Sequence, residues 1–589
     1  MTLRRFFGNK LAHWNVPWKV PRFWVVSVLR TLTTQNLGVH HGYSQTTNKF
    51  ILWEKTIFDK KNLIPVITVF LFFSIYVLVG YLIYKDYGGS ADEPNDYRRG
   101  QVNYDRFVGG SLAEFKKTCS KSDSICNYPP LFSMLLYWYA PGGDSQAMYW
   151  RRHQLTFAFF VFSVFIFFLI GKKIFKDWKI GLLGALFLII SPRIFAQSFY
   201  NPKDIPFLST YVISIYTLLL FLEKKNVFTA ILHGIAIGVM CSIRTPGLII
   251  IPITFFFYLF DLFLSNEKWQ SYLKASLLFL FSCIIAAGLV YWFTPKLYTN
   301  PIANYIQIFN IMKRYPWSDY QLYMGQNISN HIPWHYSIVW FSISSPVFYL
   351  VLFLLGGITL VIRTLRSRLR EHFRSMGDLY LVEACGILPI IAVIVMKSVL
   401  YTDNRQMYFV YPALLLISLY GFKSLIDKIH QKSQFWRLWM AIILIAGLAY
   451  PVYFMIRYHP YQATYFNFLA GSKMSIIKNR FILDAWGLST KDGLEYIAKT
   501  DPAQKITVLI FGNFRGGWLL LPEPDRQRLN VLYPQKGTQS LDIINSQSPE
   551  YIIDTYRRYP VEKVTGGKAV YSIKVGDADI LTVYKMNGN

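Results

Sequence analysis

The chain has 589 residues, of which 53% are hydrophobic, 18% aromatic and only 16% charged, and its formal net charge is +28. Repeated apolar runs near the length that crosses a hydrocarbon core of roughly 30 Å exclude a soluble globular protein and indicate a polytopic membrane protein. The basic residues lie in short blocks between these runs, which is typical of cytoplasmic loops, so the positive charge does not indicate a nucleic-acid partner.

Residues 1–61 are predicted to form a basic cytoplasmic segment. They contain ten Lys or Arg against two acidic residues and lack a compact apolar core followed by a small-residue cleavage site, so they do not read as a removable signal peptide. The stretch "VPRFWVVSVLRTL" within them is expected to lie on the membrane surface.

A transmembrane domain is predicted over residues 62–456, with about eleven helices by the length criterion. The expected spans are 62–84, 154–171, 179–192, 205–222, 227–243, 244–264, 271–293, 338–361, 380–400, 406–426 and 437–456.

The direction of the spans follows from their connections. The basic stretches "GKKIFKDWK", "EKKN", "RTLRSRLREHFR" and "KSLIDKIHQKSQFWR" fall on one side of the alternation, and the positive-inside rule places that side in the cytosol. The alternate connections therefore face outward. They include the long loop 85–153, "RIFAQSFYNPKD", "SIRTPG", the segment 295–335, "YTDNRQ" and everything after Arg457.

The stretch 472–589 is predicted to be a small α/β domain outside the membrane. Its apolar runs shorten to strand length in "KITVLIFG", "NVLY" and "DILTVYKM", and they alternate with the helical patterns "TKDGLEYIAK" and "SLDIINSQ". In the outer loop, six residues separate Cys119 from Cys126. This gap permits a disulfide in an oxidising compartment, with two free thiols as the alternative.

The first outer loop carries the acidic cluster "ADEPNDYRR", with Asp92, Glu93 and Asp96. A carboxylate at a membrane boundary can act as a general base, and Asp92 is the best placed of the three. On this stretch alone, the simpler interpretation is a solvated loop whose charges pair locally.

Other outer segments supply polar groups at the same boundary. The short loop "SPRIFAQSFYNPKDIPF" provides Arg193, Asn201, Lys203 and Asp204, and two further cations stand at Arg244 and Arg405. Each cation alone could merely extend to the lipid headgroups. Taken together they predict a pocket for an anion carried by a lipid, because Arg and Lys hold phosphate in complementary ways.

These residues belong to an ordered series of motifs between about residues 92 and 497. The series contains "ADEP", "YPPLF", "RRHQLTF", "SPRIFAQSFYNPKDIPF", "IPWHYSIVWFSISSP", "DNRQMYFVYPALLL", "HPYQATYFNFLAGS" and "DAWGLSTKDGLEYI". It resembles the bacterial branch of the protein O-mannosyltransferase-like glycosyltransferases, GT-C fold enzymes that also include the lipid A aminoarabinose transferases.

The resemblance implies a GT-C fold in a bacterial inner membrane and transfer of a sugar, with inversion, from a polyprenyl-phosphate donor to a lipid, glycan or protein outside the cytoplasm. It implies that Asp92 is the base, with Glu93 as its catalytic neighbour. It further implies that Lys203, Arg244 and Arg405 are candidates for holding the donor phosphate. Asp96, Arg193, Asn201, Asp204 and His335 complete the candidate substrate-binding set.

Metal dependence is left open. His335 in "PWHY" and His459 in "RYHP" are far apart and lack the paired spacing of a zinc site, so no metal ligands are predicted, although a divalent ion is compatible with the carboxylates. The alternative class is a polytopic transporter or lipid flippase, for which ionisable residues at mid-bilayer in broken helices are expected.

Overall fold

The computed structural model describes residues 60–586 except for 122, 143–144, 266–267, 318–319, 367–368, 431–432, 513–514, 534–547, 558–563 and 565. The predicted basic segment 1–61 therefore lies almost entirely outside the described residues. The chain divides into two compact units, Met1–Tyr76 and Val77–Asn589. The candidate site and the C-terminal domain both lie in the second unit.

Within the described residues, nine helices are long and apolar enough to cross a membrane, or ten spans if one bent pair counts as one. The nine are α3 (Lys60–Ile83), α8 (Ser145–Phe175), α11 (Asp204–Lys224), η2 with α13 (Thr245–Ile249 and Ile250–Ser265), α14 (Trp269–Phe293), α17 (Val347–Arg366), α18 (Leu369–Val395), η4 with α19 (Arg405–Val410 and Tyr411–His430) and α20 (Gln434–Arg457).

The predicted number of about eleven spans is not confirmed. The difference lies at the predicted span 227–243, where α12 (Val227–Cys241) has only 15 residues. A helix of that length is about 22 Å long, short of a hydrocarbon core of roughly 30 Å.

The helices approach one another closely where glycines face each other. A β-carbon added to Gly356 of α17 would meet the main chain of α19 at Ile417 and Gly421, and one added to Gly421 would meet the backbone of Gly356. Small residues at such crossings let two backbones pack without intervening side chains.

The bent pair consists of α9 (Trp178–Ile189) and α10 (Pro192–Tyr200), which meet at 70°. Pro192 has no N–H to continue the helical hydrogen bonds, so the chain turns at Ser191 and starts a new helix. Every residue of α10 is buried. The turn delivers Asn201 and the start of α11 to the end of the bundle that carries Asp92, called the site end from here on.

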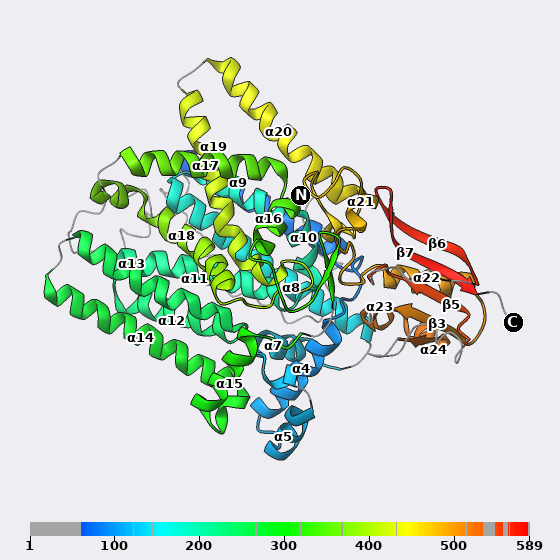
Figure 1. The fold of residues 1–589 in the computed structure, drawn as a ribbon. Coiled ribbons are helices and arrows are strands. Elements are labelled where there is room, and N and C mark those ends of the chain that lie inside the picture. Colours follow the sequence, from blue (N-terminus) through cyan, green and yellow to red (C-terminus); the bar gives the residue numbers. More distant parts are fainter. Residues whose placement is uncertain are drawn as a thin grey trace, which may run out of the picture. The chain divides into compact units, whose positions relative to one another are not determined.

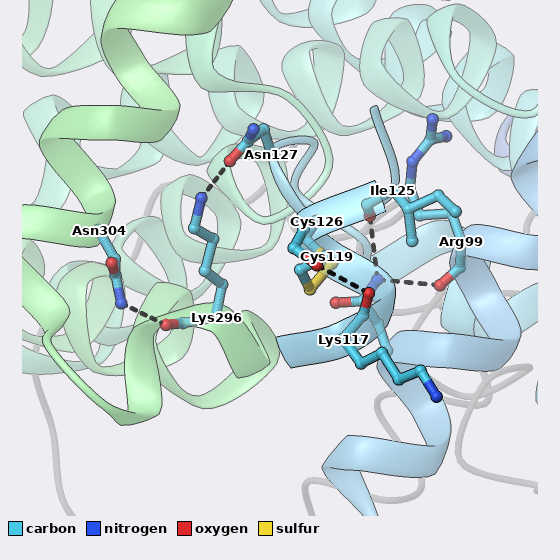
Figure 2. The surroundings of a disulfide bond; sticks show 10 residues. Arg99, Lys117, Cys119, Ile125, Cys126, Asn127, Lys296 and Asn304 are labelled. Atoms are coloured by element: carbon cyan, nitrogen blue, oxygen red, sulfur yellow. Dashed lines mark hydrogen bonds between the residues drawn. A yellow bond between two sulfur atoms is a disulfide. The ribbon is translucent and has the colours of Figure 1, made fainter. Parts of the chain in front are cut away.

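Four helices follow α3 at the site end: α4 (Glu93–Phe107), α5 (Leu112–Lys121), α6 (Asp123–Cys126) and α7 (Leu131–Tyr139). Cys119 and Cys126 form a disulfide that joins α5 to α6. The residues on either side of Cys126 are also tied to the rest of the fold. Asn103 of α4 donates to the Ile125 carbonyl, and Lys296 donates to the Asn127 side chain, a contact drawn in Figure 2.

The C-terminal domain contains a five-stranded sheet in the order β4-β3-β5-β7-β6, drawn in orange and red in Figure 1. Its elements are α22 (Thr490–Thr500), β3 (Ile506–Phe511), α23 (Arg515–Leu519), α24 (Glu523–Arg528), β4 (Leu529–Leu532), β5 (Tyr551–Asp554), β6 (Gly567–Val575) and β7 (Ala578–Met586). Strands β4, β3 and β5 are parallel, and β7 runs antiparallel to β5 and β6.

Three of these strands and helix α22 fall on the runs from which they were predicted. The predicted helix "SLDIINSQ" (540–547) lies outside the described residues. The observed architecture is therefore a polytopic α-helical membrane bundle with a small C-terminal α/β domain.

Candidate active site

Charged side chains from four separate segments meet at the site end. Asp92 directly precedes α4, Lys203 and Asp204 begin α11, Arg244 directly precedes η2, and Arg405 begins η4. Together with Asp96 in the first turn of α4, they form one continuous set of ion pairs, called the ion-pair cluster from here on. The structure thus brings together six residues that the sequence nominated separately.

Asp92 joins two of the cations. Its Oδ2 lies 3.4 Å from Lys203 Nζ and 3.2 Å from Arg405 Nη1. Although Asp92 stands at the start of α4, its side chain makes no capping hydrogen bond, so its carboxylate is committed to the cluster. Its side chain is 26% exposed, whereas those of Asp96 and Asp204 are 0% and 1% exposed. Asp92 is therefore the most accessible carboxylate of the cluster.

The charges around Asp92 set its protonation state. Burial raises its pKa, but the nearby cations Lys203, Arg405 and Arg99 outweigh burial and hold the pKa well below its ordinary value. Asp92 is consequently ionised at neutral pH, as a general base requires.

Asp204 is the buried centre of the cluster. Its Oδ2 lies 3.0 Å from Arg405 Nη1, and its Oδ1 accepts from Arg244. Asn201 donates from Nδ2 to Asp204 at 3.0 Å and accepts the Asp204 N–H at 2.9 Å. The "NPKD" sequence thus closes a turn at the start of α11, and Asp204 fixes the two guanidinium groups beside the positive end of that helix.

Asp96 lies one helical turn after Asp92 on the same face of α4. It pairs with Arg99 and lies 3.4 Å from Lys203 Nζ. Lys203 is therefore shared between two carboxylates, which orients its ammonium group toward α4.

Arg193 reaches the cluster through Asp403. Arg193 Nη1 lies 3.6 Å from Asp403 Oδ2, and Asp403 Oδ1 accepts the backbone N–H of Arg405 at 2.6 Å. Burial raises the pKa of Asp403 to about 6, against the lowering effect of Arg193 and Arg405. Thr402 and Asp403 have left-handed φ values of 55° and 64°, a sparsely populated conformation for a β-branched residue. This strained turn directs Arg405 into the cluster.

Aromatic rings pack against the cations. The Arg405 guanidinium lies 4.6 Å from the centroid of Trp486, and Lys203 Nζ lies 5.3 Å from that of Tyr128. The hydroxyls of Tyr128 and Tyr401 are 3.0 Å apart. Among the described residues, Arg405 Nε and Trp486 Nε1 are buried donors without a hydrogen-bond partner. Two donors on facing groups are thus available to an acceptor atom of a ligand.

Two of the nominated residues lie apart from the ion-pair cluster. Glu93 turns toward α8, where its Oε1 is 3.0 Å from His153 Nε2 and its Oε2 accepts the Ser90 N–H at 2.7 Å. Its side chain is buried, so a structural role fits it better than contact with a substrate. His335 contacts Tyr323, whose hydroxyl lies 2.8 Å from Nδ1.

An apolar groove of about 420 Å³ begins at the cluster. Arg244, Tyr128 and Tyr401 line one end, and residues of α13, α15 (Pro301–Lys313) and α18 line the rest. A second hollow of about 450 Å³, almost wholly apolar, continues along α13 and α18, and the two share Ile249 and Met396. A charged end followed by a long apolar channel suits a lipid with an anionic headgroup.

Several residues of the site escaped the sequence analysis. They are Tyr128, Tyr401, Asp403 and Trp486. All four stand inside quoted motifs, so motif membership was their signal, but nothing in the sequence showed that they face the cluster. Glu383 of α18 was also missed. It is buried within a span, and neither of its carboxylate oxygens has a hydrogen-bond partner among the described residues.

No group of three or more His, Cys, Asp or Glu side chains in the described part of the chain is arranged to hold a metal ion. The carboxylates of the cluster are paired with Lys and Arg instead.

Residues 150–292 match the model of the dolichyl-phosphate-mannose-protein mannosyltransferase family. This segment contains Arg193, Asn201, Lys203, Asp204 and Arg244. This match, over 143 of the 589 residues, agrees with the resemblance noted in the sequence. No match was found among curated proteins.

Solved structures with a similar chain path were also found. An oligosaccharyltransferase from Archaeoglobus fulgidus is 12% identical with a TM-score of 0.45, and the match covers 79% of this chain and 66% of that one. ArnT from Cupriavidus metallidurans, bound to undecaprenyl phosphate, is also 12% identical with a TM-score of 0.45, and the match covers 88% and 98% of the two chains. This chain thus spans just under two thirds of the archaeal enzyme.

Proposed function

We propose that the protein transfers a sugar from a polyprenyl-phosphate donor to an acceptor outside the cytoplasm, with inversion at the sugar carbon and with Asp92 as the general base. The observation that carries the proposal is Asp92 itself. It is the one partly exposed carboxylate of the ion-pair cluster, and it lies 3.2 Å and 3.4 Å from cations that can hold a phosphate.

The grooves support a lipid-linked donor. Arg244 stands where the ion-pair cluster meets the apolar groove, so a phosphate bound there leaves its isoprenoid tail to follow α13 and α18. Arg405 Nε and Trp486 Nε1 offer further donors to phosphate or sugar oxygens. The partial positive charge at the start of α11 adds to the attraction for an anion.

The proposed step is a single displacement. An acceptor oxygen or nitrogen forms a bond to the anomeric carbon from the face opposite the phosphate, while the bond between that carbon and the phosphate oxygen breaks. The electron pair leaves with the phosphate, whose negative charge Lys203, Arg244 and Arg405 stabilise. The acceptor's proton passes to the Asp92 carboxylate, and the sugar carbon is inverted.

In the structure, the Asp92 carboxylate pairs with Lys203 and Arg405, two of the cations that would bind the donor phosphate. Donor binding must therefore loosen the contacts of Asp92 to Lys203 and Arg405. Loss of those contacts, together with the negative charge of the phosphate, raises the pKa of Asp92 toward its ordinary value and makes it a stronger base. Donor binding and activation of the base are thus one event.

A third hollow, of about 680 Å³, supports an entry for the acceptor. It lies across Tyr315 from the lipid groove, and it is lined by Trp317, Trp334 and Tyr336. Trp317 stacks on Tyr401 with ring centroids 5.2 Å apart, which connects this hollow with the rings around Arg405. A concave surface that combines aromatic rings with polar groups can hold a ligand and fix its orientation.

The orientation proposed from the sequence places the site end outside the cytoplasm, in a bacterial inner membrane. At the opposite end, Lys173 of α8 pairs with Glu223 of α11 at 2.6 Å, and Lys225 pairs with Asp261 of α13 at 2.5 Å. The basic connections of the helices gather there, as cytoplasmic loops do.

The direct test is transfer by the purified protein. Incubation with polyprenyl-phosphate sugars and with envelope extracts from a strain that lacks the protein should release free polyprenyl phosphate and add one sugar mass to an extract component. Mass spectrometry identifies the sugar and the acceptor together. Asp92→Asn serves as the inactive control, and equal product with both proteins would refute the proposal.

A lipid flippase is the alternative class. Buried Glu383 and the bent pair α9–α10 are features that such proteins share. In reconstituted vesicles, a flippase would move the lipid-linked sugar across the bilayer without an acceptor, whereas the proposed enzyme consumes the donor only when the acceptor is present.

A further inference from the structure

Two parts of the C-terminal domain contact the loop that leads into Asp92. The first part is Asp484–Lys491. Its Trp486 carbonyl accepts the Ala91 N–H at 3.2 Å, and Lys491 Nζ donates to the Lys85 carbonyl at 3.1 Å. A β-carbon added to Gly88 would collide with the main chain of Leu488. The loop therefore packs on this segment backbone against backbone.

The second part is α23. A β-carbon added to Gly516 would lie 2.6 Å from both the Gly89 carbonyl carbon and the Ser90 oxygen. A β-carbon added to Gly89 would lie 2.9 Å from Gly516 Cα. Distances below 3.0 Å from backbone atoms cannot be relieved by turning a side chain, so one main chain would have to move. The two main chains can come this close only because residues 89 and 516 are both glycine.

The same domain also holds the other side of the cluster. The Trp486 ring packs under the guanidinium of Arg405 at 4.6 Å, while the carbonyl of the same residue binds Ala91. Asp484 shapes this turn by accepting the backbone N–H groups of Leu488 and Ser489 at 3.1 Å and 2.9 Å. One short segment thus contacts both the residue before Asp92 and its cation Arg405.

We infer that the C-terminal domain is part of the catalytic apparatus, because Trp486 and Gly516 act as positioning residues that hold Asp92 against Lys203 and Arg405. The inference rests on the proposed function and gives the C-terminal domain a role in it. The domain sets the distance between the base and the cations, and the donor still binds through residues of the membrane bundle.

The test compares two glycines of the C-terminal domain. Gly516→Ala places its methyl group against the loop before Asp92, whereas Gly567→Ala places a crowded methyl group against Met586 and Tyr584, within the C-terminal sheet. We expect Gly516→Ala to bind the lipid donor at least as tightly as wild type and to lose about 10²-fold in single-turnover transfer, the loss typical of misplacing a catalytic group by about 1 Å. Gly567→Ala should keep transfer within a few fold, measured per folded molecule.

Gly89→Ala approaches the same contact from the other side, and it replaces Gly516→Ala if that variant does not fold. Gly288→Ala controls for the substitution itself, because its β-carbon meets open space. A reduced yield or melting temperature with normal turnover of the folded fraction would mean that Gly516 is merely structural, and the inference would then be wrong. This outcome is distinct from failure of the proposed function, which Asp92→Asn alone decides.

Discussion

Replacing Asp92 by Asn should abolish transfer while leaving donor binding intact or tighter. Asn has the shape of Asp but cannot accept a proton at neutral pH, so the acceptor is no longer deprotonated as it attacks. General-base assistance contributes roughly 10²- to 10⁴-fold to a rate. The expected loss in single-turnover rate is therefore of that size, about 3 to 5 kcal/mol in the activation barrier.

The gain in donor affinity follows from the ion pairs. The Asp92 carboxylate competes with the donor phosphate for Lys203 at 3.4 Å and for Arg405 at 3.2 Å. Partly exposed ion pairs contribute about 0.2 to 1 kcal/mol each. Their removal should lower the donor Kd by up to roughly 30-fold, the equivalent of about 2 kcal/mol.

The assay is single-turnover transfer from a radiolabelled lipid-linked sugar, with the donor Kd measured separately and folding matched by thermal unfolding. Asp105→Asn is the control, because Asp105 is an exposed acid on the same helix. Transfer by Asp92→Asn within a few fold of wild type would refute the assignment of the base. A weaker donor Kd in Asp92→Asn would refute the competition between its carboxylate and the phosphate.

Further predictions address pH, the donor, the disulfide and topology. Because cations hold the pKa of Asp92 well below its ordinary value in the free enzyme and the donor phosphate raises it, the acid limb of kcat should lie at higher pH than that of kcat/KM; coincident limbs would contradict this. Lys203→Ala should raise the donor KM by at least about 30-fold, since losing one partner of a buried charge pair costs about 2 to 5 kcal/mol, and an unchanged KM would remove Lys203 from the donor site. Replacing both disulfide cysteines by Ser should lower the free energy of unfolding by about 2.5 kcal/mol for a ring of roughly eight residues, and denaturant unfolding with and without reductant measures this. A cysteine at Lys499, whose side chain is 74% exposed, should react with an impermeant reagent from outside, and one at Asp427, 61% exposed, only after the inner face is opened; the reverse pattern would invert the proposed orientation.

The sequence predicted which charged residues form the site, but it did not predict how they are arranged. Lys203, Arg244 and Arg405 were nominated because single cations at those boundaries are unexpected, and the structure places all three in one cluster. The sequence named Asp92 as the base and Glu93 as its catalytic neighbour, but it could not show that the two side chains point apart. Consecutive residues at the start of a helix point about 100° apart, so one faces Lys203 and the other faces His153.

Other contacts depend on tertiary packing and leave no local pattern. Trp486 lies far from Arg405 in the chain, and Asp403 becomes part of the site only because a left-handed turn aims it at Arg193. The glycine spacing of "GNFRGGW" (512–518) fits neither of the phosphate-binding fingerprints, so the stretch does not read as a nucleotide site. Its second glycine, Gly516, instead packs against the loop of the base. A motif search looks for glycines that contact a ligand, so it does not detect glycines that let two main chains pack together.

The contact between Gly89 and Gly516 has a consequence for chimaeric enzymes. Because main chain meets main chain there, neither partner can adapt by choosing another rotamer, and compatibility depends on the absence of side chains on both sides. A C-terminal domain exchanged between related proteins should support transfer only where donor and recipient both have glycine at these positions. In a library of such exchanges, turnover should depend first on whether both positions hold glycine. Differences in sugar or acceptor should affect turnover only among the exchanges that meet this condition.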